Sequence, residues 1–128
     1  MLLGLYTPQA LASEKPDSKQ PINIESDYAE FDDQKGTAFY KGHVISIQGS
    51  RHLISDTLTI YRGKDNKIDL MVATGKPARF KSRPNPEKSE GRGKANTIRY
   101  YPREDKAILI DDAELTQNGD IINGKQLT

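Results

Sequence analysis

The side chains able to do chemistry are few, and their spacing is poor for catalysis. The two histidines, His43 and His52, stand on either side of a turn signal at Gln48-Gly49, so a hairpin could bring their imidazoles together. We expect no metal there, because no carboxylate motif accompanies the pair and histidines on exposed strands are far commoner than ligands. The acidic pairs Asp32-Asp33 and Asp111-Asp112 lack calcium-loop spacing and fit positions beside turns, where Asp bonds its own backbone.

Other catalytic arrangements are missing from the 128 residues of the chain. No serine lies in a Gly-x-Ser-x-Gly elbow, and no glycine-rich phosphate loop opens a helix pattern. No pair of carboxylates is marked as acid and base. The absence of cysteine excludes disulfides, thiolate metal sites and a cysteine nucleophile. We therefore expect a protein that is not an enzyme and that needs no metal or cofactor.

One stretch of the chain is strongly basic. Residues 76–94 hold seven lysines and arginines against Glu87 and Glu90, so seven minus two leaves a local net charge of +5. Prolines and glycines in the same stretch predict a long exposed loop over 82–91. These charges either keep neighbouring strand edges from mispairing or attract phosphate groups of a ligand. The net charge of the whole chain is +1, which argues against a nucleic-acid-binding protein.

The elements that must position these residues have a period of two. Apolar and polar residues alternate over 22–25, 57–60 and 97–100, and turn signals such as Gln48-Gly49-Ser50 interrupt the runs at short intervals. No window combines helical spacing with caps. The apolar fraction of 34% and the mean hydropathy of −0.75 are low, but the regular spacing argues against disorder. The pattern predicts an all-β fold of short antiparallel strands.

The chain also resembles itself at an offset of about seventy residues. Residues 42–59 align with 112–128, and residues 26–40 align with 96–110. Each copy reads as strand, polar turn, strand, Gln/Asn-Gly turn and strand. The repeat predicts one hairpin unit that is stacked along a common hydrophobic trough.

The N-terminus predicts export from the cytoplasm. Residues 1–12, MLLGLYTPQALA, form an apolar stretch ending in Ala10-Leu11-Ala12, and small residues at the first and third of these positions suit signal peptidase. We interpret 1–12 as the remnant of a signal peptide, 13–20 as a flexible N-terminus and 21–128 as the folded domain. A short buried helix or a plain disordered tail is the alternative for 1–12.

A β domain with so few large side chains should struggle to close a thick core. If its sheets splay apart, the inward row of isoleucine, leucine, phenylalanine and tyrosine becomes a trough open at both ends. Such a trough suits an extended apolar ligand, because each buried methylene contributes about 0.8 kcal/mol. The alternative is that the same side chains meet one another in a closed sandwich core.

Three segments of the sequence resemble the OstA-like family of lipopolysaccharide-transport proteins, the family of LptA. They are PINIESDYAEFDDQKGTAFYKGHVISIQG, ATGKPARFKSR and ANTIRYYPREDKAILIDDAELTQNGDIINGKQLT. The recurring features are the opening Gln-Pro-Ile-x-Ile-x-Ser-Asp, the Gly-x-Val-x-x-x-Gln-Gly turn and the Gly-Lys-Pro-Ala-x-Phe strand. The resemblance covers almost everything from Gln20 to Thr128.

The resemblance implies an antiparallel, V-shaped β-jellyroll that is open at the ends. It implies a periplasmic protein that shields the lipid A acyl chains of lipopolysaccharide. Such proteins stack as a head-to-tail homo-oligomer, from a complex containing LptC at the inner membrane to LptD at the outer membrane. The resemblance also implies at least one further C-terminal strand pair, and we expect this sequence to stop before it.

Two other functions remain open at this point. The first is a structural adaptor with the same fold that binds no lipid, as in LptC or the N-terminal region of LptD. The second is a carbohydrate-binding β-sandwich, which would need exposed aromatic platforms. The chain has no tryptophan, and most of its aromatic residues fall within strand patterns.

The resemblance also implies where a ligand binds. The ligand-lining positions of the family fall on Ile22, Ile24, Phe80 and Tyr100. Alternation along the strands adds further apolar residues that we expect to face the same trough, namely Phe31, Phe39, Val44, Leu58, Ile60, Ile98 and Leu115. A β-bulge would turn some of these additions outward.

Overall fold

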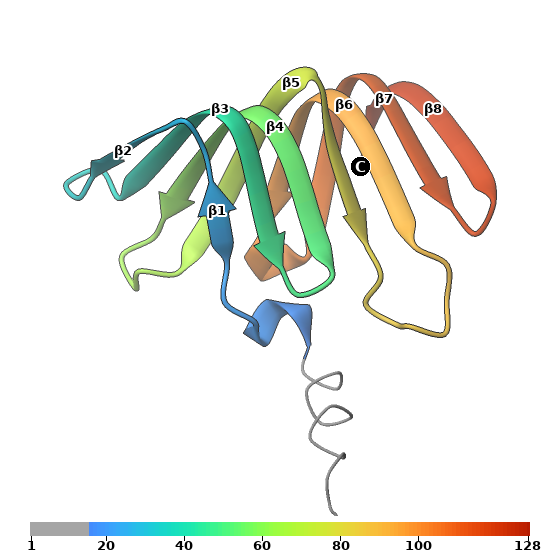
Figure 1. The fold of residues 1–128 in the computed structure, drawn as a ribbon, viewed down its shortest axis with the longest axis horizontal. Helices are drawn as coiled ribbons and strands as arrows, with labels where there is room; N and C mark the ends of the chain where they lie inside the picture. The colour runs from blue at the N-terminus through green and yellow to red at the C-terminus, as the bar shows by residue number, and fades with distance from the viewer. Residues whose placement is uncertain (1–15) are drawn as a thin grey trace, which may run out of the picture.

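A computed structural model describes residues 16–128 of the protein. The stretch over 1–12 that we interpret as a signal remnant lies outside the described residues. Within 16–128, eight antiparallel strands form one sheet in the order β1-β3-β4-β5-β6-β7-β8, and β2 also pairs with β3 (Figure 1). The prediction of an all-β antiparallel fold is confirmed.

The long strands pair with their neighbours in sequence, as a meander does. The strands are β1 (Asn23–Glu25), β2 (Tyr28–Asp32), β3 (Thr37–Gln48), β4 (Arg51–Arg62), β5 (Ile68–Ser82), β6 (Gly91–Tyr101), β7 (Lys106–Gln117) and β8 (Asp120–Leu127). Two short 3-10 turns, η1 (Asp17–Lys19) and η2 (Pro102–Glu104), complete the fold. None of the helices in residues 16–128 is long and apolar enough to span a membrane.

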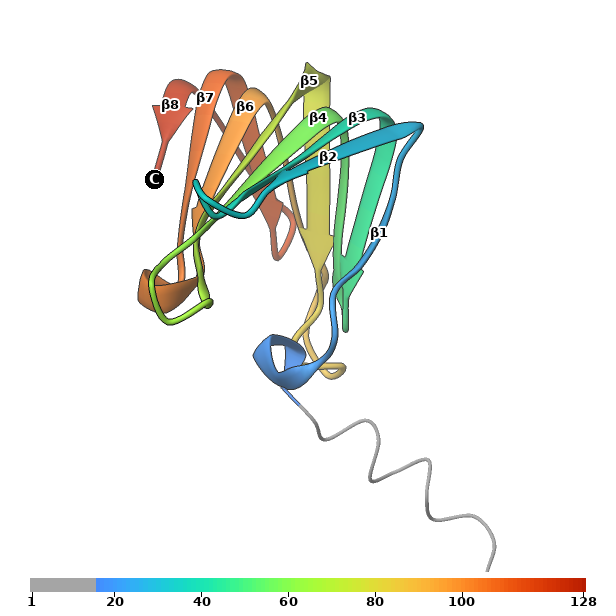
Figure 2. The ribbon, with the colours of Figure 1, turned by 90° about the vertical axis from the view of Figure 1, so that its left-hand side faces the viewer.

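The sheet is bent into a V with one ridge and two diverging walls (Figure 2). Strands β3 to β8 cross the ridge, so each wall contains part of each of them. We call the wall next to η2 the A wall and the wall next to η1 the B wall. The A wall comprises residues 37–41, 57–62, 68–74, 97–101, 106–110 and 126–127, and the B wall comprises 44–48, 51–54, 78–82, 91–95, 113–117 and 120–124.

Irregular pairing marks the ridge in every one of these strands. The register shifts between Lys41 and Val44 in β3 and between Ile54 and Thr57 in β4. Corresponding shifts follow in β5, β6 and β7. Because a bulge bends the strand that carries it, a row of bulges across the sheet folds it along one line.

Left-handed backbone conformations support this bend at equivalent places in the two repeats. In β3, Gly42 and His43 have φ of +86° and +49°, and in β7, Asp111 and Asp112 have φ of +67° and +52°. The Asp111-Asp112 pair therefore lies in a bulge within a strand, and not beside a turn as we expected. A Cβ on Gly42 would meet the carboxylate of Asp27, so only glycine lets the β1–β2 connection pass this close.

The hairpins β3–β4 and β7–β8 make the internal repeat visible. Both cross the ridge at a positive-φ pair, and both turn through a glycine, Gly49 in the first and Gly119 in the second.

The predicted long loop is also present, since β5 ends at Ser82 and β6 begins at Gly91. Its backbone is held by Arg83, whose guanidinium donates to the carbonyl oxygens of Pro86 and Lys88.

The core lies along the ridge, where the two walls converge. It combines small side chains with larger ones: Ala78, Ala95 and Ala113 are at most 2% exposed, and Val44 and Leu58 are 0% exposed. Small residues alternate with large ones there because the opposing inner faces are too close for two large side chains. Apolar residues that are only partly buried lie further down the walls, where the V is wider.

Candidate functional site

The inner face of the V carries apolar residues on both walls. Directly paired positions place Leu53, Phe80, Gly93 and Leu115 in one row across the B wall. The A wall carries a corresponding row made of Ile60, Met71, Tyr100 and Ala107. Both rows lie on the face that carries the core, on walls that diverge away from the ridge (Figure 2).

A concavity of about 410 Å³ lies between the walls. Its apolar lining comes from both sides, with Leu53 and Phe80 from the B wall and Met71, Ile98 and Tyr100 from the A wall. Phe80 reaches its place because Gly93 lies directly opposite on β6, and the ring occupies the space that a side chain at Gly93 would fill. The middle of the trough is therefore an open apolar groove.

A second concavity, of about 560 Å³, continues the trough toward the N-terminal end of the sheet. It is lined by Ile22 and Ile24 from the B-wall side and by Ile60 and Ile68 from the A wall. Phe31 stands at its open end, 66% exposed, with its ring edge-on to Tyr40. Ile22 lines both concavities, so the two lie next to each other along the trough.

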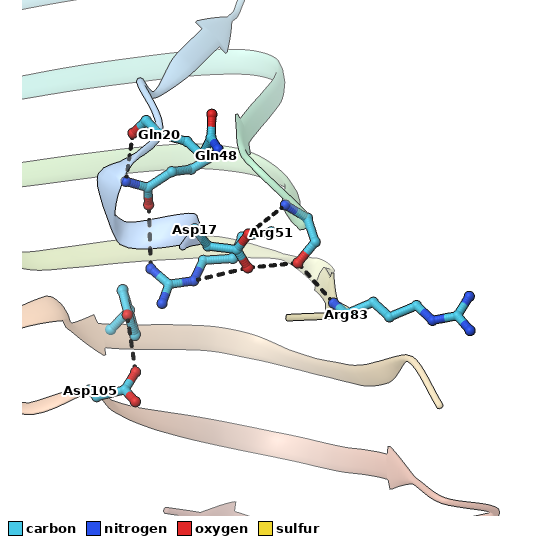
Figure 3. A network of polar contacts seen from close by, with 8 residues as sticks. Asp17, Gln20, Gln48, Arg51, Arg83 and Asp105 are labelled. Carbon is cyan, nitrogen blue, oxygen red and sulfur yellow. Dashed lines mark hydrogen bonds and ion pairs between the residues drawn. The ribbon is translucent and has the colours of Figure 1, made fainter. Parts of the chain in front are cut away.

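A polar network ties the N-terminal turn η1 to the mouth of the B wall (Figure 3). The carboxylate of Asp17 accepts from the backbone N–H of Ser50 at 3.0 Å and from its hydroxyl at 2.6 Å. The hydroxyl oxygen of Ser50 accepts in turn from the backbone N–H of Arg83 at 2.9 Å. Of the segment 13–20 that we predict to be flexible, residues 13–15 lie outside the described part of the chain, and Asp17 is bonded to the β3–β4 turn.

One side chain reaches across the mouth from wall to wall. The guanidinium of Arg51 lies 5.5 Å from the centre of the Tyr100 ring, within reach of a cation–π interaction. The Arg51 Nε atom is 3.9 Å from an Asp17 oxygen, and Tyr100 donates its hydroxyl to Asp105 at 3.4 Å (Figure 3). Burial raises the pKa of Tyr100, so its hydroxyl stays protonated at neutral pH. Arg51 and Tyr100 thus form a contact that links the two walls.

Most of the residues predicted to face the trough lie on its inner surface. Ile22, Ile24, Phe31, Ile60, Phe80, Ile98 and Tyr100 line the two concavities. Leu115 faces the same side by register, since it is directly opposite Gly93. Contact of any of these side chains with a ligand stays a prediction.

Three of the alternation-based assignments differ in the structure. Phe39 faces outward, because β3 directs its neighbours Ala38 and Tyr40 to the core side and successive side chains alternate. Val44 and Leu58 face inward but are 0% exposed, so they belong to the packed ridge and offer no surface to a ligand. For these three residues the prediction of trough lining is wrong.

Sequence reasoning missed several trough residues. Leu53, Ile68 and Met71 line the concavities, and their alternation was readable, but the register shift in β4 hid the side on which Leu53 lies. Arg51 and Asp17 carried no signal at all. Asp17 lies in a turn that packs on the β3–β4 turn, and Arg51 contacts a residue of the opposite wall. Neither arrangement can be recognised from the residues next to them in sequence.

The two histidines do not come together. His43 lies at the ridge, where its Nδ1 atom is 2.7 Å from a carboxylate oxygen of Asp27. His52 is paired with Ile47 near the β3–β4 turn, at the other end of the B wall. The hydrogen bond to Asp27 raises the pKa of His43 above its ordinary value. Across residues 16–128, no group of three or more His, Cys, Asp or Glu is placed to hold a metal ion.

Known proteins share this sequence pattern. The family described as LptA/(LptD N-terminal domain) LPS transport protein matches residues 23–128. The lipopolysaccharide export system protein LptH of Pseudomonas aeruginosa is 35% identical over 111 residues, which cover 87% of this chain and 63% of that protein. The lipopolysaccharide export system protein LptA of Escherichia coli is 32% identical over 114 residues, which cover 88% of this chain and 60% of that protein.

The fold has a solved counterpart as well. The crystal structure of LptH, described as the LptA-homologous periplasmic component of the lipopolysaccharide transport device of Pseudomonas aeruginosa, matches with a TM-score of 0.82 and 34% identity. The match covers 88% of this chain and 77% of that one, whereas the chain spans 63% of the full LptH sequence. Sequence and fold therefore agree that this chain belongs to the LptA/LptD N-terminal domain family of lipopolysaccharide-transport proteins.

Proposed function

We propose that the protein is a non-enzymatic, periplasmic carrier of lipopolysaccharide that shields the lipid A acyl chains between the walls of the V. The observation that carries this proposal is the pair of neighbouring concavities in the trough, which take apolar lining residues from both walls. Names of the similar proteins support the same substrate. The description of LptH as a periplasmic component supports the compartment.

Burial of an alkyl chain supplies enough free energy for this role. Each buried methylene contributes about 0.8 kcal/mol, so ten methylenes contribute about 8 kcal/mol before the cost of ordering the chain. The concavity between the walls has a mainly apolar lining, so an acyl chain there needs no ionic anchor. The sugars of the ligand would stay outside, on the open side of the V.

The same proposal includes assembly with partners. The sheet presents β8 as a strand edge at one end and β1 and β2 at the other end (Figure 1). Edges of this kind can add strands of another chain by β-augmentation. We propose head-to-tail stacking of copies through these edges, with LptC as partner at the inner membrane and LptD as partner at the outer membrane.

Photo-crosslinking in cells tests the carrier function. A photoreactive amino acid replaces Phe80 on the inner face, and matched controls carry it at Phe39 on the outer face or at Lys88 in the β5–β6 loop. We expect a lipopolysaccharide adduct at Phe80 and none at Phe39 or Lys88. Absence of an adduct at Phe80 in a folded, exported protein would contradict lipid shielding and favour an adaptor role, which the family allows because it includes the N-terminal domain of LptD.

A further inference from the structure

The outer face of the B wall carries an unusual arrangement of basic side chains. Arg79 on β5 is directly opposite Lys94 on β6, and Lys81 is directly opposite Arg92. Like charges in directly opposite positions of a sheet repel each other and destabilise the pairing. Two such pairs follow one another on the same two strands, so the sequence retains a local repulsion that a polar residue would remove.

Only two of these four basic side chains have a carboxylate partner. Glu90 forms an ion pair with Arg92 at 2.7 Å, and Glu114 lies 3.8 Å from the ammonium group of Lys94. Arg79 and Lys81 are both exposed, and neither has a carboxylate partner among residues 16–128. Their charges are therefore available to an anion from solution.

The rim of the A wall shows the opposite arrangement. There Arg103 on η2 binds two carboxylates, with its Nη2 atom 2.6 Å from Asp65 and its Nε atom 2.5 Å from Asp69. The hydrogen bond from Arg103 lowers the pKa of Asp65, and the hydrogen bonds to Asp65 and Asp69 raise the pKa of Arg103. Arg103 at this rim is thus neutralised by two carboxylates, unlike Arg79 and Lys81 on the B wall.

The basic side chains surround a hollow on the outside of the B wall. This concavity has a volume of about 460 Å³ and is lined by Arg79, Lys81, Arg92 and Lys94, with Ile54 also at its surface. Ile54 is 52% exposed although it is apolar. Glu114 is the one carboxylate in this lining, and it lies against Lys94, so the four basic side chains outnumber it. A hollow with an excess of cations and an exposed apolar contact suits a phosphate-bearing group of an amphiphile better than it suits a small hydrated ion.

This outer hollow adjoins the mouth of the trough. His52, Phe80 and Lys81 line both the outer concavity and the concavity between the walls. Lys81 is next to the end of β5 at Ser82, so it lies at the rim itself. The acyl chains of a ligand in the trough would emerge at this rim. The polar part of the ligand would then lie next to the basic outer face.

We propose that the outer face of the B wall, centred on Arg79 and Lys81, binds phosphate groups on the saccharide part of the glycolipid whose acyl chains lie in the trough. This inference rests on the proposed carrier function and adds a second subsite to it. The trough binds apolar chains without regard to the headgroup. The basic face then selects for ligands that carry phosphate and fixes the orientation of the saccharide relative to the B wall.

Binding measurements with two forms of the ligand test the proposal. The double variant Arg79→Gln/Lys81→Gln is compared with Lys35→Gln/Lys64→Gln, which removes the same charge from exposed positions elsewhere in the chain. For phosphorylated lipopolysaccharide at low salt we expect roughly tenfold weaker binding by the first variant and no change for the second. Chemically dephosphorylated lipopolysaccharide should bind the wild type and both variants with the same affinity. The first variant should also have a thermal midpoint at least as high as the wild type, since it removes a repulsion.

Each other result has a defined meaning. Equal affinity of Arg79→Gln/Lys81→Gln and the wild type for phosphorylated lipopolysaccharide overturns the phosphate subsite and leaves the carrier function intact. Binding of phosphatidylglycerol vesicles or of inorganic pyrophosphate through Arg79 and Lys81, as strongly as of lipopolysaccharide, assigns the face to a membrane surface or a free anion and also overturns it. Failure of the wild type to bind either form of lipopolysaccharide overturns the carrier function together with the subsite.

Discussion

The ridge and the mouth of the trough are built from the same strands and differ in what their side chains meet. At the ridge, Ala78 is directly opposite Ala95 and both are 0% exposed. Two residues further along β5, Phe80 is much larger and yet only half-buried, on the edge of an open concavity. The divergence of the walls therefore decides whether an inward residue becomes core or lining. Hydrophobicity alone does not distinguish the two.

The largest effect should come from removing volume at the ridge. Leu58→Ala should lower the free energy of unfolding by about 2 to 5 kcal/mol, because it deletes a fully buried side chain and leaves a cavity between converging walls. Ile54→Ala on the same strand is the control, and its cost should stay below about 1 kcal/mol because Ile54 is half exposed. Urea unfolding measures both. Similar losses for the two variants would show that the ridge is not the main core.

The next largest difference should come from enlarging a side chain, which should destabilise the ridge and leave the stability of the trough unchanged. Ala78→Leu should destabilise the protein by about 1 to 3 kcal/mol, since no space is left around a buried alanine at the ridge. Ala107→Leu adds the same atoms beside the concavity between the walls, and the unfolding free energy should change by less than about 0.5 kcal/mol. The second variant should instead weaken lipopolysaccharide binding, measured by titration. A large loss of stability in Ala107→Leu would mean that the groove is already filled by side chains.

The polar contacts at the mouth should matter less than the ridge. Asp17→Ala removes the acceptor of two hydrogen bonds from Ser50, and we expect a loss of about 1 to 2 kcal/mol in unfolding free energy. Lys19→Ala in the same turn is a suitable control, because Lys19 is exposed and should change stability by at most about 0.5 kcal/mol. Hydrogen exchange of the Ser50 amide gives a local readout. Unchanged protection in Asp17→Ala would show that η1 does not hold the mouth.

The smallest effect concerns the ridge again and depends on pH. The pKa of His43 is raised above 6.5 in the folded protein, first through its hydrogen bond to Asp27 and then through the charge of Asp27. A raised folded pKa stabilises the protein below the unfolded pKa, and this contribution disappears as pH rises through the folded pKa. Asp27→Asn should therefore lower the thermal midpoint more at about pH 5.5 than at about pH 9. The same substitution in a His43→Asn background should show no such difference, and a persisting difference would assign the pH dependence to another group.

Local patterns were sufficient for the fold and for part of the site. Alternation and turn signals predicted an antiparallel all-β chain, and prolines and glycines predicted the exposed loop between Ser82 and Gly91. These features depend on neighbours in sequence. Ile22, Phe80 and Tyr100 were placed by resemblance, and the structure puts all three in the lining of the concavity between the walls.

The remaining features depend on where the sheet bends and on which residues meet across it. Alternation within one strand does not say which face is inside, so Phe39 was assigned to the wrong side of β3. The full burial of Val44 and Leu58 follows from their distance to the ridge, which no spacing encodes. The contact of Arg51 with Tyr100 joins β4 to β6 across the mouth, and it exists only because the two walls face each other.

A comparison of two single-cysteine variants tests the central claim, that lipid enters between the walls. The chain has no cysteine, so Phe80→Cys and Phe39→Cys can each be labelled uniquely with a polarity-sensitive fluorophore. On addition of lipopolysaccharide, the label on the inner face at position 80 should shift its emission toward the blue, because acyl chains replace water around it. The label on the outer face at position 39 should not change. Equal shifts at both positions, or none at position 80 while the ligand is bound, would contradict a lipid-filled trough.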